Sequence, residues 1–344
     1  MGRTRVAMFT LGGTIAMTPQ PGGGVAPTLS GAELVAAVPG LADTGVAVEV
    51  HDFRRVAGWA LGPADLLALA VEIEREVRGG VDGVVVTQGT DTIEETAYLL
   101  DLVYAADAPL VVTGAMRNPG LAGADGPANV LAAVWVAASA EARGLGCVVV
   151  FADEIHAARQ VRKAHTTSIT AFASRPGPIG YVLEDRVRVP LRPARSVVVN
   201  GVDPDRRVST AVVLATLGDD GSVLRAVAER LDGLVVAGFG AGHVPPGWVP
   251  MLTEAAQRIP VVLASRTGAG SVLAGTYGAA GSESDLLSGG LISAGALQPV
   301  KAHVHLHLLI QAGVDRTGIA HALAVAGDLH VTPSATSVRK CNAG

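Results

Sequence analysis

The sequence predicts an α/β protein: a larger N-terminal domain with a mainly parallel sheet flanked by helices, then a smaller C-terminal α/β domain. Two observations predict it. Apolar runs of strand length alternate with segments of helical periodicity along most of the chain. These runs are rich in valine, alanine and leucine, which is typical of parallel strands buried on both faces. With 49% hydrophobic but only 3% aromatic residues, the core is expected to be aliphatic.

The N-terminal half contains the clearest alternation. Strands are predicted at 4–10, 82–87, 109–114 and 146–151. Helices are predicted near 63–78, 92–106 and 125–143. This order predicts βαβ units with right-handed crossovers.

The C-terminal half shows a second, shorter alternation. Residues 185–208 are rich in Arg, Pro and Val without helical periodicity, which indicates an extended linker. After it, strands are predicted at 210–216, 233–238 and 260–264, with helices near 246–258 and from about 300. The expected boundaries are an N-terminal catalytic domain at 1–190, a linker at 191–208 and a C-terminal domain at 209–344.

Charge and hydropathy exclude several classes of partner. The formal net charge of −5 offers no general basic surface for nucleic acid or an anionic membrane. Apolar runs are too short to span a bilayer. The first residues lead directly into a strand, so we expect no secretory signal and a cytoplasmic protein.

Two glycine-containing turns each carry a threonine directly after a predicted strand. Thr14 follows Gly12 and Gly13, and Thr90 follows Gly89. Ligands of open α/β sheets bind beyond the carboxyl ends of the strands, and glycines let backbone N–H groups approach them. Together the turns look like two halves of one active site, although each alone is also ordinary turn chemistry.

The surroundings of these turns sharpen the prediction. Residues 92–95 (Thr-Ile-Glu-Glu) fit a capping box, which puts Thr90 and Asp91 at a helix mouth suited to an anion or oxyanion. The Pro- and Gly-rich segment 17–28 cannot be helical. We expect it to be a mobile loop and favour a lid over the site above a plain connection.

Lysine usage singles out one amine. Of 26 basic residues only three are lysines: Lys163, Lys301 and Lys340. Arginine stays protonated, whereas lysine can be tuned to act as a base. Lys163 could reach Thr90 and Asp91 across the sheet, and such a cluster can move a proton without histidine. A surface lysine without a role remains the alternative.

Other polar residues carry weaker signals. Cys147 lies in a predicted buried strand and Cys341 in the tail, without metal or redox spacing. His303, His305 and His307 could suggest a metal. In a helix only the first and third share a face, and no carboxylate joins them, so we interpret them as structural.

The two threonine turns lie in the segments GGTIA at 12–16 and QGTDTIEETA at 88–97. In these segments, which look like two family signatures, the sequence resembles the bacterial-type L-asparaginases, two-domain amidohydrolases with a threonine nucleophile. Further likenesses are VTGAMR at 112–117, DGPAN at 125–129, Lys163 followed by His165-Thr166-Thr167, GPIGY at 177–181 and LQPVKA at 297–302. In order, they cover roughly residues 6–325.

The resemblance implies a reaction. Thr14 would attack the side-chain amide of L-asparagine, form a β-acyl ester and release ammonia. Thr90, assisted by Lys163 and Asp91, would direct water at the ester and release L-aspartate. No metal or organic cofactor is implied.

The resemblance also implies binding residues and an assembly. The expected substrate contacts are Gly58, Trp59, Gly89, Asp91, Ala115 and Glu283. Asp91 would bind the α-ammonium group. Glu283 sits where the family contributes a carboxylate from a neighbouring subunit, which implies a dimer that completes the site, usually paired into a tetramer.

Departures from the family pattern keep alternatives open. No tyrosine occurs between Thr14 and Tyr98, where the family has one in its lid, and residues 57–61 lack the usual Ser-Gln-Asp side chains. The substrate carboxylate is then expected to rely on the Gly58 N–H. A catalytically weak or silent amino-acid-binding protein, or an amidohydrolase for a related amide, remains an alternative. An amidotransferase subunit ranks lower, because it needs an extra N-terminal domain.

Three single positions depart as well. Leu11 stands where the family usually has threonine, Gln88 replaces a common histidine, and His243 replaces a usual asparagine.

Overall fold

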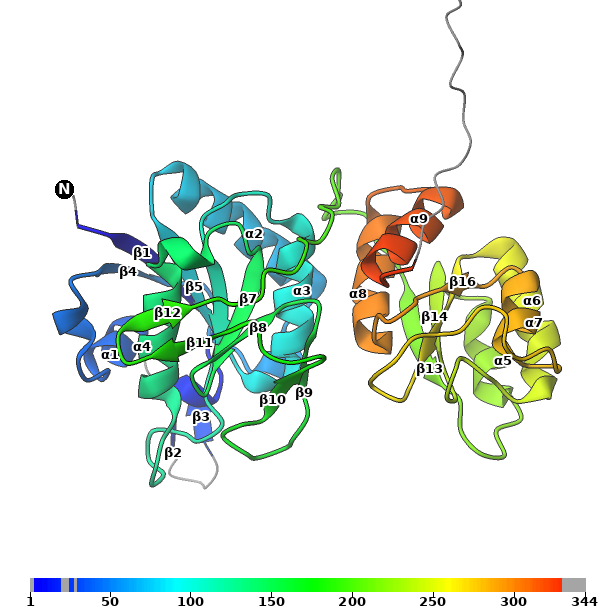
Figure 1. Cartoon of the computed structure of the whole chain (residues 1–344), viewed down its shortest axis with the longest axis horizontal. Coiled ribbons are helices and arrows are strands. Elements are labelled where there is room, and N and C mark those ends of the chain that lie inside the picture. Colours follow the sequence, from blue (N-terminus) through cyan, green and yellow to red (C-terminus); the bar gives the residue numbers. More distant parts are fainter. Residues whose placement is uncertain (1–2, 20–24, 28–29, 330–344) are drawn as a thin grey trace, which may run out of the picture. The chain divides into compact units, whose positions relative to one another are not determined.

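The chain consists of two α/β units, the first ending at Arg206 and the second beginning at Arg207 (Figure 1). The computed structural model describes residues 3–19, 25–27 and 30–329, with the side chains of 16–29 left out. The predicted fold class is confirmed: a mostly parallel sheet with helices in the larger first unit and a small parallel sheet in the second. Among the described residues, no helix is both long and apolar enough to span a bilayer.

The first unit is built on an eight-stranded sheet with the strand order β12-β11-β8-β7-β6-β5-β1-β4. The five strands from β7 to β4 run parallel, and β8, β11 and β12 pair antiparallel at the other edge. The strands are β1 (Arg5–Thr10), β4 (Ala47–Asp52), β5 (Gly83–Thr87), β6 (Leu110–Thr113), β7 (Cys147–Phe151), β8 (Glu154–Ala157), β11 (Gly180–Leu183) and β12 (Arg186–Arg188). The sequence predicted the four central strands but not β4, β8, β11 or β12.

Helices cover both faces of this sheet. Val6 and Met8 of β1 pack with residues of α1 and α4 on one face, whereas Ala7 and Phe9 pack with α2 and α3 on the other. The strands are therefore apolar at successive positions, which is why their sequence shows no alternation. The helices are α1 (Gly31–Ala36), α2 (Pro63–Arg78), α3 (Ile93–Val103) and α4 (Gly126–Ala137), with 3₁₀ turns at Thr14–Ala16, Leu41–Thr44, Gly58–Ala60, Thr90–Thr92 and Ala140–Ala142.

Two small hairpins complete the first unit. β9 (Val161–Lys163) pairs with β10 (Phe172–Ser174), and β2 (Met17–Pro19) pairs with β3 (Val25–Pro27). The segment 17–28 is not helical in its described parts, as predicted, and these parts form an antiparallel ladder that was not predicted. Residues 20–24 and 28 of that segment lie outside the described residues, and the lid remains a prediction.

The segment expected to be a free linker is attached to the first unit. Arg186–Arg188 is strand β12, which corrects the start of the extended segment proposed at 185–208. Beyond it, the guanidinium of Arg195 donates to the Tyr104 carbonyl at 2.8 Å, and the Val199 N–H donates to a carbonyl of α3 at 2.7 Å. These two hydrogen bonds hold the segment that was predicted to be a linker against the C-terminal end of α3.

The second unit has a four-stranded parallel sheet in the order β13-β14-β15-β16. Its strands are β13 (Thr210–Leu214), β14 (Gly233–Gly238), β15 (Val261–Ser265) and β16 (Ile292–Ser293). Its helices are α5 (Ser222–Ala228), α6 (Val249–Arg258), α7 (Glu283–Ser288), α8 (Pro299–Gln311) and α9 (Arg316–Ala326), with a 3₁₀ turn at Pro246–Trp248. The predicted strands are present; α5, α7, α9 and β16 were not predicted.

Two minor predictions can be compared with this fold. His303 and His307 share one face of α8, where the Thr210 hydroxyl lies 2.9 Å from His303 Nε2 and 3.0 Å from His307 Nδ1. This contact to β13 supports the structural interpretation of the histidines. Cys147 is buried in β7 and forms no disulfide within the described part of the chain, and Cys341 lies outside the described residues.

Candidate active site

Three turns of the first unit meet backbone to backbone at three glycines. A Cβ on Gly89 would lie 2.9 Å from the Gly58 nitrogen and 3.4 Å from the Gly13 Cα, and a Cβ on Gly13 would collide with the Gly89 nitrogen. Gly13 also has a φ of +85°, a conformation that side chains disfavour. Because Thr14 follows Gly13 and Thr90 follows Gly89, this junction brings the two predicted threonine turns together.

The sheet explains why these turns meet. β1 and β5 are neighbouring parallel strands in which Thr10 pairs with Thr87, so both chains leave the sheet at the same edge. The Leu11 N–H donates to the Thr87 carbonyl at 2.9 Å, which carries the pairing one residue further. The site therefore lies at the carboxyl edge of the parallel strands, as predicted.

Lys163 joins the second turn. From the end of β9, its Nζ donates to Thr90 Oγ1 at 2.9 Å and to Asp91 Oδ1 at 2.7 Å. The lysine side chain is 15% exposed and that of Asp91 48%, while Thr90 as a whole is only 4% exposed. The arrangement is thus a buried hydroxyl, a largely enclosed amine and a carboxylate open to solvent. The three groups can exchange a proton along a path of hydrogen bonds.

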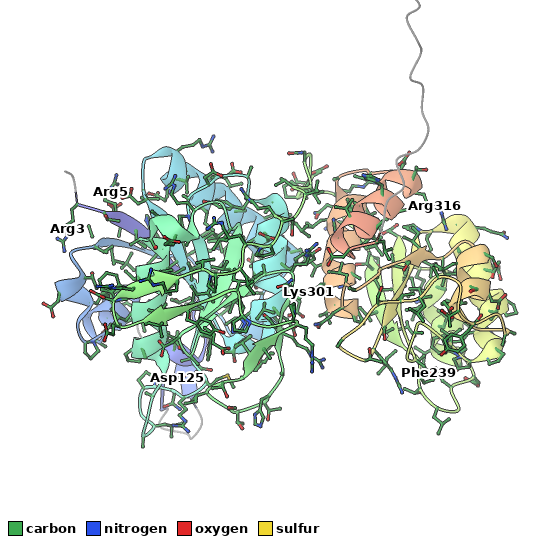
Figure 2. All side chains as sticks on the ribbon, in the orientation of Figure 1. Arg3, Arg5, Asp125, Phe239, Lys301 and Arg316 are labelled. Atoms are coloured by element: carbon green, nitrogen blue, oxygen red, sulfur yellow. The ribbon has the colours of Figure 1, made fainter. Side chains whose placement is uncertain are left out.

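The turn after β6 forms a further wall and contains Ala115, which is buried. A Cβ on Gly114 would lie 3.4 Å from Thr90 Cγ2, so this turn packs on the Thr90 turn. Asp125, labelled in Figure 2, fixes it by accepting from the N–H groups of Met116 at 3.0 Å and Arg117 at 2.8 Å. The predicted residues Ala115 and Thr90 are therefore neighbours.

Thr92 corrects the predicted capping box. It occupies the N-cap of α3, but its side chain makes no capping hydrogen bond. Its hydroxyl instead donates to the Gly58 carbonyl at 3.0 Å and accepts from Gln88 Nε2 at 3.3 Å. Thr90 and Asp91 still lie at the start of the helix, because the 3₁₀ turn Thr90–Thr92 leads directly into α3.

The Gly58–Ala60 turn presents a large aromatic side chain. Gly58 itself is buried at the glycine junction, whereas Trp59 is 71% exposed. The one side-chain hydrogen-bonding group at residues 58–60 is the Trp59 indole N–H, so the other polar contacts from this turn come from its backbone.

Asp52 is a residue that the sequence analysis missed. Its Oδ1 accepts from the Thr10 hydroxyl at 2.7 Å and from the Gly31 N–H at 2.8 Å. One carboxylate oxygen thereby links the last residue of β1 to the first residue of α1, the two ends of the segment that contains Thr14. These bonds from Thr10 and Gly31 hold the pKa of Asp52 below its ordinary value. The pairing of Thr10 with Asp52 could have indicated the contact had β4 been predicted.

Glu283 lies in the second unit and is fully buried. Its Oε1 accepts from the N–H groups of Thr276 and Tyr277, both at 2.9 Å, and its Oε2 lies 3.1 Å from His243 Nε2. Burial works to raise the pKa of Glu283, but the hydrogen bonds from Tyr277, Thr276 and His243 outweigh it, so the pKa lies below its ordinary value. The structure thus gathers the other predicted site residues in the first unit and Glu283 in the second.

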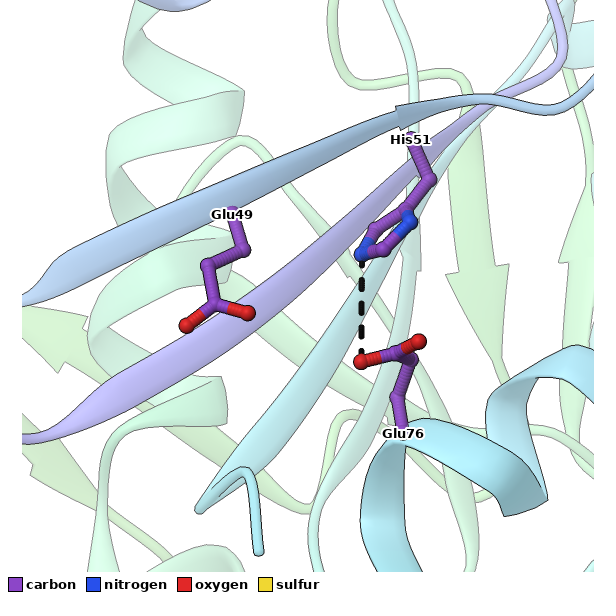
Figure 3. A group of neighbouring side chains, drawn as sticks. All are labelled: Glu49, His51 and Glu76. Atoms are coloured by element: carbon purple, nitrogen blue, oxygen red, sulfur yellow. Dashed lines mark ion pairs between the residues drawn. The ribbon is translucent and has the colours of Figure 1, made fainter. Parts of the chain in front are cut away.

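One group of potential metal ligands occurs among the described residues, on β4 and α2 (Figure 3). The ligand atoms of Glu49, His51 and Glu76 lie within 4.8 Å of one another. However, Arg5 donates to both carboxylate oxygens of Glu49, at 2.8 and 3.2 Å. Since this cluster already contains a cation, we assign it no metal.

Comparison with known proteins gives consistent matches along the chain. Residues 5–195 match the family model "Asparaginase, N-terminal" and residues 210–323 match "Glutaminase/Asparaginase C-terminal domain". A probable L-asparaginase of Deinococcus radiodurans is 40% identical, covering 92% of this chain and 95% of the relative. An L-asparaginase of Bacillus licheniformis is 36% identical over 89% of this chain and 95% of its own length.

A solved structure is similar as well. The crystal structure of a probable cytoplasmic L-asparaginase from Campylobacter jejuni superposes with a TM-score of 0.83 at 31% identity. The match covers 93% of this chain and 99% of that one.

Proposed function

The chain belongs to the asparaginase family, and from this premise we propose that it hydrolyses the side-chain amide of L-asparagine to L-aspartate and ammonia. Membership makes it an amidohydrolase, and relatives bearing the name L-asparaginase match it over nearly their whole length. The observation that carries the proposal is the contact of the Lys163 amine with both Thr90 and Asp91. That contact supplies the proton path that an unaided hydroxyl lacks.

In the first proposed step, the Thr14 hydroxyl attacks the amide carbon. The Thr14 oxygen forms the new bond to carbon, and backbone N–H groups of the glycine turns stabilise the oxyanion. Collapse breaks the C–N bond, and the proton lost by Thr14 ends on the departing ammonia. The result is a β-acyl ester of Thr14.

In the second proposed step, Thr90 directs water at the ester. The Thr90 hydroxyl takes up the proton of the water as it gives its own to Lys163, and Lys163 passes a proton on to Asp91, the acceptor of its other hydrogen bond. Cleavage of the ester returns the proton to Thr14 and releases L-aspartate. Burial of Thr90 and of most of the lysine side chain strengthens these interactions by limiting solvent.

The substrate would be held by groups around the glycine junction. We propose that the half-exposed Asp91 carboxylate binds the α-ammonium group and that the Gly58 N–H, beside Trp59, binds the α-carboxylate. Gly89 and Ala115 would line the amide end of the pocket. Neither Gly58 nor Trp59 supplies a hydroxyl or amide side chain, so the α-carboxylate would have fewer hydrogen-bond donors, and a weaker grip, than one held by serine and glutamine.

We further propose a cytoplasmic homodimer, paired into a tetramer, in which Glu283 contributes to the site of a neighbouring subunit. The resemblance supports the assembly, and the Campylobacter jejuni relative, whose name includes the word cytoplasmic, supports the location. Because Glu283 is fully buried, His243, whose side chain is 33% exposed, would be the group of this pair that faces a ligand.

Ammonia release from L-asparagine by the purified protein tests the activity. Thr14→Ala and Lys163→Met should each lower kcat by at least about 100-fold, since general acid–base and covalent catalysis contribute on that scale. Arg162→Met is the matched control, because Arg162 is the exposed neighbour of Lys163 on β9.

Near-full rates in both variants would refute the assigned roles. Calorimetric binding of L-aspartate without any amide turnover would instead favour a silent binding protein. That candidate is motivated by the absence of a tyrosine between Thr14 and Tyr98 and of Ser, Gln and Asp side chains at residues 57–61.

A further inference from the structure

We propose that Gln88 and Thr92 are positioning residues that hold the Gly58–Ala60 turn against the Gly89–Asp91 turn. The two side chains form a hydrogen-bond chain behind the site, and neither needs to touch the reacting atoms. The catalytic meaning of this chain rests on the proposed function, because it assumes that the Gly58 turn holds the substrate.

The direction of the chain follows from the groups involved. Gln88 Nε2 donates to the Gly89 carbonyl at 3.2 Å and to Thr92 Oγ1 at 3.3 Å. An amide nitrogen can only donate, so the Thr92 oxygen is the acceptor in its bond with Gln88. The single proton of the Thr92 hydroxyl is then donated to the Gly58 carbonyl at 3.0 Å. The chain therefore runs one way, from the Gln88 amide to the Gly58 backbone.

The far end of the chain is also where the Gly58 turn closes on itself. The Gly58 carbonyl accepts from the Leu61 N–H at 3.3 Å as well as from Thr92. A Cβ on Gly58 would lie 2.8 Å from the Gly89 oxygen, so the two turns are already in van der Waals contact. Glycine contact brings the backbones together but gives no direction, whereas the Thr92 hydrogen bond fixes the orientation of the turn.

Gln88 suits the other end of the chain because it is fully buried and carries two protons on one nitrogen. It can donate to Gly89 and Thr92 at once. Within the described part of the chain its amide oxygen has no hydrogen-bond partner. Burying an amide oxygen without a hydrogen-bond partner lowers the free energy of unfolding. We therefore attribute the role of Gln88 to its two donated hydrogen bonds rather than to packing.

The proposed division of labour makes a kinetic prediction. The Gly58 turn would contact the non-reacting end of the substrate, so loosening it weakens substrate and transition state alike and raises KM. Lys163 contacts Thr90 from β9 and is not part of the Gln88–Thr92 hydrogen-bond chain. Because loosening that chain leaves this contact in place, kcat should be preserved.

The test compares Thr92→Val with Thr92→Ser, which keeps the hydroxyl. Thr96→Val is the matched control, since Thr96 lies on the same helix, is fully buried, and has an unpaired hydroxyl among the described residues. Thr92→Val should raise KM for L-asparagine about 3- to 10-fold with kcat within about twofold, as expected for one lost hydrogen bond. Thr92→Ser and Thr96→Val should stay within about twofold of the parent. An unchanged KM in Thr92→Val overturns the proposal.

A second measurement needs no substrate. Of the three tryptophans, Trp248 is fully buried, so in a Trp135→Phe background acrylamide reports mainly on Trp59, within the turn itself. The quenching constant should change in Thr92→Val and Gln88→Met but not in Thr92→Ser or Thr96→Val. Equal quenching in Thr92→Val and Thr96→Val overturns the positioning role. A shift in a protein that hydrolyses no amide supports that role while the proposed function fails.

Discussion

The two units each contain a carboxylate paired with a basic side chain, and the pairs differ in exposure. In the first unit, Asp91 contacts Lys163 while almost half of its side chain remains exposed. In the second, Glu283 contacts His243 but is fully buried and accepts two further backbone hydrogen bonds. A carboxylate with open lone pairs can bind a ligand, whereas one whose oxygens are occupied mainly holds its own loop together. The exposure of the carboxylate thus distinguishes the pair that is suited to binding a ligand from the pair that stabilises its own loop.

The largest expected effect is on Asp91. Asp91→Asn keeps the shape of the side chain but removes its negative charge. That charge lies beside Lys163 and is the one proposed to bind the ligand's ammonium group. We expect kcat/KM to fall at least about 100-fold, with Tm within about 2 °C of the parent, because exposed ion pairs contribute little stability. Steady-state kinetics and calorimetric melting measure the two quantities. A large loss of Tm would make Asp91 a structural residue like Glu283.

Glu283→Gln should show the opposite result to Asp91→Asn, with its larger effect on the stability of the subunit. The amide nitrogen replaces an oxygen that now faces His243, and two charge-assisted bonds from Thr276 and Tyr277 become neutral. We expect Tm to fall by about 5 °C. Differential scanning calorimetry tests this, with Ser284→Ala, a partly buried neighbour on α7, as the control. A Tm unchanged from the parent contradicts the structural role.

Acid titration sharpens the same comparison. The pKa of Glu283 lies below its ordinary value of 4.5, so this group contributes stability that is complete above that pH and is lost as pH falls through the lower, folded pKa. The parent should therefore lose Tm more steeply than Glu283→Gln below about pH 4.5. Asp52, whose pKa is also lowered, should give the same sign in the first unit. Parallel acid limbs in parent and variant would argue against an ionised buried Glu283.

The smallest effect is expected where the second unit uses a neutral hydroxyl. Thr210→Val removes the hydrogen bonds to His303 and His307 without changing side-chain size. The free energy of unfolding should fall by about 1 kcal/mol, measured by urea denaturation, with kcat/KM unchanged. A loss of activity would show that the face with the histidines is functional rather than structural.

The central strands of the first unit were predictable because helices bury both of their faces. The valine runs at 84–86 and 148–150 are typical of buried strands. β4 was missed since it is an edge strand whose residues are only partly buried and include Glu49 and His51. β9 and β12 were missed because three residues carry no periodicity.

The site divides in the same way. Thr90 and Asp91 were predicted from a glycine turn directly after a buried strand, and Lys163 from the scarcity of lysine in the chain. Asp52 was not, because its contact depends on the register of a strand that the sequence did not reveal. The Thr92 cap was predicted wrongly because its hydroxyl accepts from the Gln88 amide, where a capping residue would accept from a helix N–H, and donates to the Gly58 carbonyl of a distant turn. Local sequence does not record these partners.

The glycine junction has a consequence for attempts to redirect this protein to other amides. Gly13, Gly58 and Gly89 touch through their main chains, so a library that varies these positions would return mostly misfolded members. Useful diversity would have to come from side chains at the rim, of which Trp59 is the most accessible. The glycine junction therefore tolerates few substitutions, and changes of selectivity are expected from residues at its edge.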